Sequence, residues 1–260
     1  MTASLLTLSA PVGPPGAPLL VLGCSLGTSA ALWAPVLPLL AGHVRVTYWE
    51  LPGHGDGAPT TAPFTLADLA DAVAAALPEP CHYAGVSLGG GVGLELAIRH
   101  PDAVLSLTTV CSAARFGEPS GWEDRARQVR AQGTGSVIVQ SAQRWFAGDT
   151  MTQDPTTTSR LLHALREADA ESYCLCCDAL AQFDVRSQLS RITAPVTALW
   201  GSLDKVTPEA SSTEIAGGVA NGRSERIDGA SHLATVDQPQ AVATAVLAVI
   251  TQAKGAIIHD

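Results

Sequence analysis

The chain has 260 residues, of which 47% are hydrophobic and 15% charged, and its formal net charge is −9. This length suits one large α/β domain, with or without an insertion, and no apolar run is long enough for a membrane-spanning helix. The acidic balance and the lack of a basic stripe exclude nucleic acid as an expected partner, and we expect no membrane partner either. The first residues lack the basic start and apolar core of a secretory signal, so we expect a cytoplasmic protein. A homo-oligomer is compatible with this composition.

The six cysteines are scattered, and three of them fall in the run CLCC at 174–177. A disulfide framework belongs to small secreted domains, and a zinc site would want paired cysteines or histidines at ligand spacing. We therefore expect free, mostly buried thiols and no metal site. These residues are Cys24, Cys81, Cys111, Cys174, Cys176 and Cys177.

Short apolar, β-rich runs alternate with longer helical patterns along most of the chain. After a Pro/Gly-rich turn at 10–18, strands are expected at 19–23, 44–49, 81–86, 104–110, 196–201 and 223–227. Helices are expected between them at 30–40, 66–77, 88–99, 208–216 and 238–251. This alternation predicts βαβ units, and therefore a mostly parallel sheet with helices on both faces.

The alternation stops between residues 116 and 191, where only helical or irregular patterns occur. The simplest interpretation is a helical insertion, or lid, between two strands of one sheet. Residues 1–115 and 192–260 would then form the α/β core.

A serine follows the expected strand 81–86 directly, in the run HYAGVSLGGGVGLELAIRH at 82–100. Gly85 and Gly89 stand two positions either side of Ser87, where larger side chains would collide across a sharp strand-to-helix turn. This G-x-S-x-G pattern is typical of a nucleophile elbow, which exposes the serine hydroxyl at a helix N-terminus. The alternative is a tight glycine turn with a serine that caps the helix.

A nucleophilic serine needs a base, and the base needs a carboxylate, which in this arrangement follow the serine in the order acid, then histidine. His232 lies in a small-residue loop after the last expected strand, whereas His259 is penultimate, where fraying is common. Asp237 is the expected N-cap of the helix that follows His232. Asp204 comes just after strand 196–201, and the segment after strand 104–110 offers no carboxylate. The expected triad is Ser87, Asp204 and His232.

Two backbone N–H groups must stabilise the negative charge that develops on the attacked carbonyl oxygen. One is expected from Leu88, directly after the nucleophile. The other is expected from Leu26, in the loop that follows strand 19–23.

The triad, the turn LPGHGDG at 51–57 and the position of the insertion resemble the α/β-hydrolase superfamily along the whole chain. Within it, the chain looks most similar to the 3-oxoadipate enol-lactonases of the β-ketoadipate pathway of aromatic catabolism. The segments that carry this resemblance are CSLGT at 24–28, CSAARFG at 111–117, RWF at 144–146 and YCLCCDALAQFDVR at 173–186. The family pattern has asparagine where this chain has Cys24 and Cys111.

The resemblance implies hydrolysis of a five-membered enol-lactone that carries a carboxylate, through an acyl-enzyme on Ser87 and without a metal or organic cofactor. A substrate carboxylate favours arginine partners, for which Arg144 and Arg186 are the candidates. Either arginine could equally pair with Asp178 or Asp184. Further candidates for substrate contact are Ser25, beside the oxyanion loop, and Trp122 and Trp145, whose alternative role is packing within the insertion. His54 is expected to be structural.

Other functions share the same triad. A carboxylesterase or an amidase that opens a small lactam would differ from a lactonase in the substrate hydrolysed, and a cofactor-free perhydrolase would show peroxide-dependent halogenation. A non-catalytic ligand receptor on the same scaffold is disfavoured, because all three triad residues are present.

Overall fold

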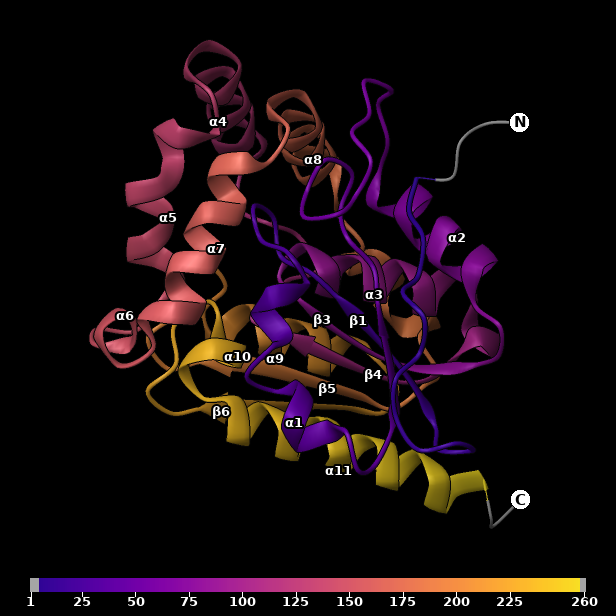
Figure 1. The fold of residues 1–260 in the computed structure, drawn as a ribbon. Coiled ribbons are helices and arrows are strands. Elements are labelled where there is room, and N and C mark those ends of the chain that lie inside the picture. Colours follow the sequence, from indigo (N-terminus) through magenta and orange to yellow (C-terminus); the bar gives the residue numbers. More distant parts are fainter. Residues whose placement is uncertain (1–4, 258–260) are drawn as a thin grey trace.

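The computed structural model describes residues 5–257, with side chains up to residue 253. Six strands form one all-parallel sheet in the order β2-β1-β3-β4-β5-β6 (Figure 1). The strands are β1 (Leu19–Gly23), β2 (Arg45–Tyr48), β3 (Cys81–Val86), β4 (Val104–Val110), β5 (Val196–Gly201) and β6 (Gly222–Ile227). The parallel sheet predicted from the sequence is confirmed.

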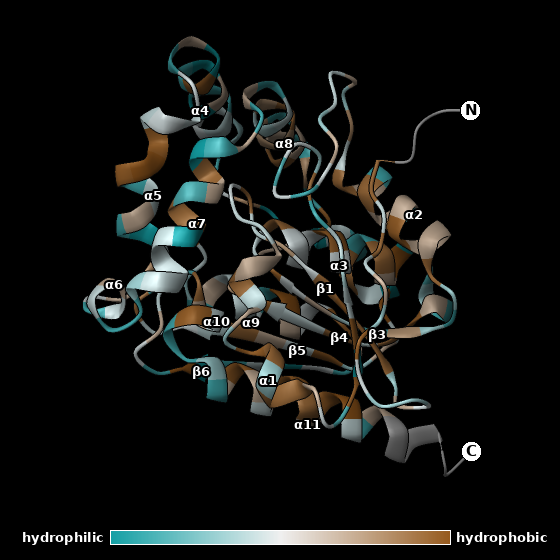
Figure 2. Ribbon diagram, in the orientation of Figure 1, coloured by the Kyte–Doolittle hydropathy of each residue, from teal (hydrophilic) through white to brown (hydrophobic). Residues whose placement is uncertain are grey.

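Helices cover both faces of this sheet, which explains why every residue of β1 and β3 is buried. Helices α1 (Leu37–Leu40) and α11 (Pro239–Ile257) pack on one face. Helices α2 (Leu66–Ala76), α3 (Leu88–Arg99) and α9 (Glu209–Gly218) pack on the other. Figure 2 shows hydrophobic residues in α11 and in the inner strands of the sheet, whereas the edge strand β6 is largely hydrophilic and mostly exposed.

The continuous helix expected over residues 30–40 is wrong. The structure has a 3₁₀ helix, Ala30–Trp33, followed by the single turn α1. Pro35 and Pro38 explain the break, because neither can donate a backbone hydrogen bond and each ring crowds the preceding turn. Proline is tolerated only near a helix start, and Pro38 lies within the first two residues of α1.

The segment before β1 touches the edge of the sheet without joining it as a strand. Two isolated antiparallel bridges connect Leu8 with Trp49 and Val12 with Val46. At the other end of the chain, α11 extends to Ile257, beyond the end expected near residue 251. No helix within residues 5–257 has the length and apolar character needed to cross a bilayer.

Helices alone lie between β4 and β5, and we refer to residues 116–191 of this stretch as the helical insertion. It contains the helices α4 (Pro119–Gln132), α5 (Ile138–Trp145), α6 (Thr150–Gln153), α7 (Pro155–Glu167) and α8 (Ala170–Gln182), and the 3₁₀ helices Thr134–Val137 and Arg186–Arg191. A 3₁₀ helix, Pro101–Ala103, precedes β4, and a short helix α10 (Ala234–Asp237) follows β6. Figure 1 shows α4, α5 and α7 standing together at one side of the sheet.

Candidate active site

The strand order places the expected site residues at one edge of the sheet. β1 lies between β2 and β3, so the chain leaves β1 and β3 in opposite directions, and a crevice opens where their following loops separate. Leu26 follows β1 and Ser87 follows β3, while Asp204 and His232 follow β5 and β6. Parallel strands bring all four loops to the same edge.

Ser87 has a strained backbone, with φ 53° and ψ −117°. Such a conformation costs a residue other than glycine about 1–3 kcal/mol, so its surroundings must hold it. The Ser87 N–H donates to the carbonyl of Val110 at 2.9 Å, and the Ser112 hydroxyl donates to the Ser87 carbonyl at 2.7 Å. Neighbouring segments therefore hold the serine at the strand-to-helix junction that the sequence predicts.

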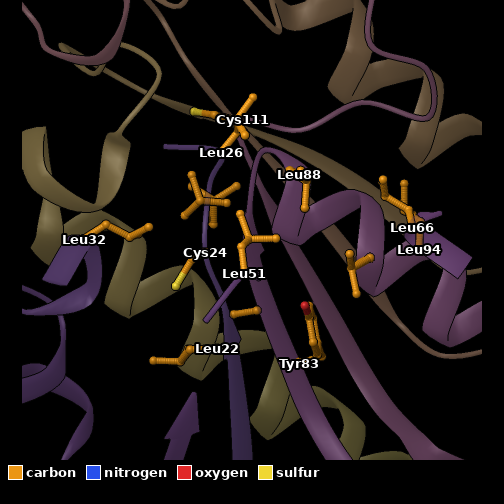
Figure 3. Packing of buried hydrophobic residues seen from close by; sticks show 14 of the residues in the cluster. Leu22, Cys24, Leu26, Leu32, Leu51, Leu66, Tyr83, Leu88, Leu94 and Cys111 are labelled. Atoms are coloured by element: carbon orange, nitrogen blue, oxygen red, sulfur yellow. The ribbon is translucent and has the colours of Figure 1, made fainter. Parts of the chain in front are cut away.

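The glycines around Ser87 are required by close backbone contacts. A Cβ at Gly85 would lie 2.3 Å from the carbonyl carbon of Gly89, and a Cβ at Gly89 would lie 2.6 Å from that of Gly23. Figure 3 shows Leu88 at the start of α3, with Tyr83 apart from it among the buried residues near the strands. Helix α3 can thus begin immediately after β3 and lie against β1.

Asp204 and His232 are hydrogen-bonded and almost completely buried. His232 Nδ1 lies 2.9 Å from Asp204 Oδ2, and the side chains of Asp204 and His232 are 0% and 4% exposed. An ionised carboxylate can only accept, so Nδ1 carries the proton and Nε2 is left free to act as a base. Thr207 Oγ1 and the Val206 N–H also donate to Asp204, each at 2.7 Å.

Two opposed effects act on the Asp204 carboxyl. Burial raises its pKa, but the electrostatic attraction of His232 and the hydrogen bonds from His232, Thr207 and Val206 outweigh burial. The net pKa of Asp204 is lowered from its ordinary value. Asp204 is therefore held as the carboxylate that can orient an imidazole and stabilise its cation.

The two expected oxyanion donors, Leu26 and Leu88, follow β1 and β3. Leu88 is the first residue of α3, so its N–H is one of those that a helix leaves without an internal acceptor. Leu26 lines the same cavity as Ser87 and precedes Gly27, whose φ is +77°. Leu26 thus comes from the loop after β1, and Leu88 from the start of α3.

Ser87 and His232 line one small cavity of about 40 Å³. Of the residues expected to contact substrate, Ser25, Trp122, Trp145 and Arg144 also line it. An outer pocket of about 220 Å³ shares four of the lining residues and extends towards the start of α4. The shared residues are Trp122, Arg125, Arg144 and Val206.

Arg125 and Arg144 both face this cavity, and within the described chain neither forms an ion pair. Arg125 is held by two neutral groups: its Nε donates to the Tyr173 hydroxyl at 2.6 Å, and its Nη2 donates at 2.9 Å to Ser141 Oγ, whose residue also lines the cavity. Burial and the neighbouring charge of Arg125 lower the pKa of Arg144. Two positive charges without a counter-ion make this wall of the cavity suited to an anion.

The structure does not bring Arg186 to the cavity. Arg186 is exposed and forms a bidentate ion pair with Asp184 at 2.7 and 2.9 Å, the alternative that the sequence left open. Asp178 pairs instead with Arg130. Asp237 does not act as the expected N-cap of α11. It ends α10, and its carboxylate bonds to groups on other segments.

Three lining residues were not identified from the sequence: Arg125, Ser141 and Val206. Arg125 could have been found, because it lies three residues after Trp122 on α4 and so shares its helix face. Ser141 and Val206 carry no such signal. They reach the cavity only through the way α5 and the loop after β5 pack.

All six cysteines are free and buried, as expected. Two of them, Cys24 and Cys111, directly follow β1 and β4. Cys24 Sγ donates to the Trp49 carbonyl at 3.4 Å, and Cys111 Sγ donates to the Ser231 carbonyl at 3.5 Å. Burial raises the pKa of both thiols well above the ordinary value, so both stay neutral.

Within the part of the chain that the structure describes, no group of three or more His, Cys, Asp or Glu residues could hold a metal ion. His259 lies outside the described residues.

Comparison with known proteins agrees with this geometry. The sequence pattern of the alpha/beta hydrolase family matches residues 13–245. The chain is 33% identical to 3-oxoadipate enol-lactonase 2 of Acinetobacter baylyi over 237 residues, which are 90% of this chain and 88% of that protein. It is also 33% identical to a pimeloyl-acyl-carrier-protein methyl ester esterase of Aeromonas hydrophila over 232 residues, 86% of this chain and 91% of that one. The crystal structure of the enol-lactonase from Burkholderia xenovorans LB400 superposes with a TM-score of 0.89 at 29% identity and covers 95% of this chain and 96% of that one.

The chain therefore belongs to the alpha/beta hydrolase family. Within that family it is an ester-hydrolysing enzyme, related both to enol-lactonases and to methyl ester esterases.

Proposed function

We propose that this enzyme opens a small enol-lactone that carries a carboxylate, the reaction that converts 3-oxoadipate enol-lactone to 3-oxoadipate. The observation that carries the proposal is the pair Arg125 and Arg144, which face the same cavity as Ser87 and have no carboxylate partner among the residues that the structure describes. A nucleophile beside an anion-binding wall fits a substrate whose ester carbonyl and carboxylate are only a few bonds apart. The similarity to two enol-lactonases of Acinetobacter baylyi supports the same substrate.

In the proposed mechanism, Ser87 Oγ attacks the lactone carbonyl while His232 Nε2 takes its proton. The N–H groups of Leu26 and Leu88 stabilise the tetrahedral oxyanion. When the intermediate collapses, the ring C–O bond breaks and the enol oxygen leaves with the proton from His232. The enol then ketonises. A water molecule, deprotonated by His232, attacks the acyl-enzyme carbonyl. The bond from Ser87 Oγ to the acyl carbon then breaks, His232 returns the proton to Oγ, and the second carboxylic acid is released.

We further propose that the helical insertion acts as a lid. The cavity of about 40 Å³ beside Ser87 is far smaller than the roughly 300–1,000 Å³ of typical ligand pockets. The outer pocket of about 220 Å³ shares Trp122 with it as a lining residue. A shift of Trp122 and the start of α4 would join the two spaces and admit the substrate.

The test combines a nucleophile variant with a matched pair of arginine variants. Ser87→Ala should lower kcat for every ester by about 10⁴-fold or more, because the covalent route is lost. Arg125→Gln should raise KM for the enol-lactone roughly 10-fold or more, while kcat/KM for p-nitrophenyl acetate, which has no carboxylate, stays within about 2-fold. Arg127→Gln is the control, because Arg127 is an exposed residue of the same helix whose ion pair is with Asp124, three residues earlier on that helix.

Loss of enol-lactone absorbance and release of p-nitrophenolate measure the two activities. Full activity in Ser87→Ala would disprove the nucleophile. Equal losses on both substrates in Arg125→Gln would disprove the carboxylate contact, and the substrate class with it.

A methyl ester esterase is the second candidate, favoured by the 33% identity to the esterase of Aeromonas hydrophila. The same residues would carry it out, with methanol as the leaving group in place of the ring enol. Monomethyl pimelate separates the two functions, because it pairs a carboxylate with an unactivated methyl ester. A higher kcat/KM for monomethyl pimelate than for the enol-lactone would favour the esterase.

A further inference from the structure

The carboxylate of Asp237 lies at a junction of three segments. It belongs to the last residue of α10, and it accepts hydrogen bonds from Thr150 Oγ1 at 2.6 Å and from the Ala147 N–H at 3.1 Å. Both donors are in the helical insertion. Its other oxygen accepts from the Ser231 N–H at 2.7 Å, and Ser231 directly precedes His232.

The same region of the insertion binds the histidine loop at two further points. Ser231 Oγ donates to the Arg144 carbonyl at 2.9 Å, and the Leu233 N–H donates to the Trp145 carbonyl at 2.8 Å. Residues on both sides of His232 are thus bonded to the end of α5. The loop that carries the imidazole is thus hydrogen-bonded to the backbone that carries Arg144 and Trp145, two residues that line the cavity.

Asp237 is held by hydrogen-bond donors alone, and within the described chain no basic side chain forms an ion pair with it. Burial raises its pKa, against the hydrogen bonds from Thr150, Ser231 and Ala147. Partial burial of a carboxylate without a counter-ion costs free energy. This carboxylate joins the insertion to the loop that carries His232. Bonds from N–H and O–H groups to a charged carboxylate are about twice as strong as neutral ones.

We propose that Asp237 is a positioning residue through which the helical insertion holds His232 in its catalytic orientation. The inference rests on the proposed role of His232 as the general base. Asp204 fixes the imidazole through Nδ1, and Asp237 fixes the backbone that carries the imidazole. Misplacing a catalytic group by about 1 Å can cost roughly 100-fold in rate, so this second anchor affects kcat.

The test is Asp237→Asn, which keeps the shape of the side chain but places an amide NH₂ against backbone N–H groups that cannot accept a hydrogen bond. With p-nitrophenyl acetate as substrate, kcat should fall about 10-fold to 100-fold and KM should change less than about 3-fold. The downfield proton resonance of His232 Nδ1–H should broaden as the loop exposes it to solvent exchange. Asp228→Asn, an exposed change in the same loop that loses only a pair with Arg226, should leave both signals unchanged.

A second variant keeps the proposal testable if Asp237→Asn folds poorly. Thr150→Val removes one donor from the insertion and leaves the carboxylate in place, so kcat should fall by a smaller factor in the same direction. The inference is overturned if either variant, assayed well below its melting temperature, keeps the wild-type kcat and the wild-type resonance. It is also overturned if activity falls only in proportion to the loss of folded protein. Failure of the proposed base would be recognised separately, as full activity in His232→Ala.

Discussion

At the scale of single residues, the strained conformation of Ser87 is the most informative feature. A φ of 53° places its hydroxyl at the start of α3, and the glycines at 85 and 89 leave room for the backbone to turn there. The strain is stored in the fold and is offset by packing elsewhere in the molecule. Substitutions at these glycines should therefore reduce both stability and activity.

Gly85→Ala tests this coupling. The new Cβ would lie 2.3 Å from the carbonyl carbon and oxygen of Gly89, so either α3 or β3 must move. Overpacking of this kind costs about 1–3 kcal/mol of unfolding free energy, and movement of the elbow should also lower kcat by about 10-fold or more. Urea unfolding and ester hydrolysis measure the two effects.

Gly121→Ala is the matched control. A Cβ there meets no atom within 4 Å, and the position lies inside α4. Alanine favours a helix over glycine by up to about 1 kcal/mol, so this variant should be as stable as the wild type or more stable. If Gly85→Ala behaved like Gly121→Ala, the steric explanation of the elbow would be wrong.

At the scale of elements, two helices of the insertion cooperate to place Arg125. The arginine lies on α4, and the Tyr173 hydroxyl that receives its Nε–H lies on α8. The guanidinium carbon also lies 5.7 Å from the centre of the Tyr173 ring. The packing of α4 against α8 thus fixes the position of the Arg125 guanidinium at the cavity.

Tyr173→Phe should weaken this placement without removing the charge. The ring keeps its packing while the acceptor for Arg125 is lost, so KM for a carboxylate-bearing substrate should rise about 3-fold to 10-fold. Activity on p-nitrophenyl acetate should hardly change. Tyr48→Phe, in β2 and away from the cavity, is a control for the loss of a hydroxyl. Equal losses on both substrates would show that Tyr173 supports the fold and not the arginine.

The sequence predicts regular elements well where a local pattern decides them. Alternating strands and helices, and the Gly85 to Gly89 motif, are local, and the structure contains them. Pro35 and Pro38 were also a local signal, and they should have excluded the long helix expected at 30–40. The expected substrate contact of Arg186 and the expected N-cap role of Asp237 were wrong for a different reason. Their partners are set by tertiary packing, which spacing along the chain does not encode.

At the scale of the whole molecule, the turn after β2 joins the α/β core to the helical insertion. His54 is fully buried in this turn, and its ring stacks on Tyr173 of α8 with centroids 5.9 Å apart. Its Nδ1–H donates to the Pro52 carbonyl at 2.8 Å. Nearby, the Asp169 N–H donates to the Gly53 carbonyl at 2.8 Å. The ionisable side chain of His54 is thus buried where the turn after β2 contacts the helical insertion.

Because His54 is buried in this contact, the stability of the protein should depend on whether His54 is protonated. Burial lowers the pKa of His54 to about 4, despite the Pro52 hydrogen bond and the charge of Asp169, which raise it. An unfolded chain has the ordinary pKa near 6.5 and binds more protons than the native state between these values. The contribution of His54 to stability is therefore complete above pH 6.5 and declines as the pH falls towards 4.

His54→Phe keeps a buried ring but removes this titration. The unfolding free energy of the variant relative to wild type should rise by up to about 3 kcal/mol as the pH falls from 6.5 to 4, because a pKa difference of about 2.5 units corresponds to that energy. Urea unfolding at several pH values measures the difference, which is independent of any constant cost of the substitution. His163→Phe, at an exposed position of α7, reports the effect of the same replacement outside this contact. A His54→Phe curve that runs parallel to wild type across this range would show that the imidazole is not held neutral between the core and the insertion.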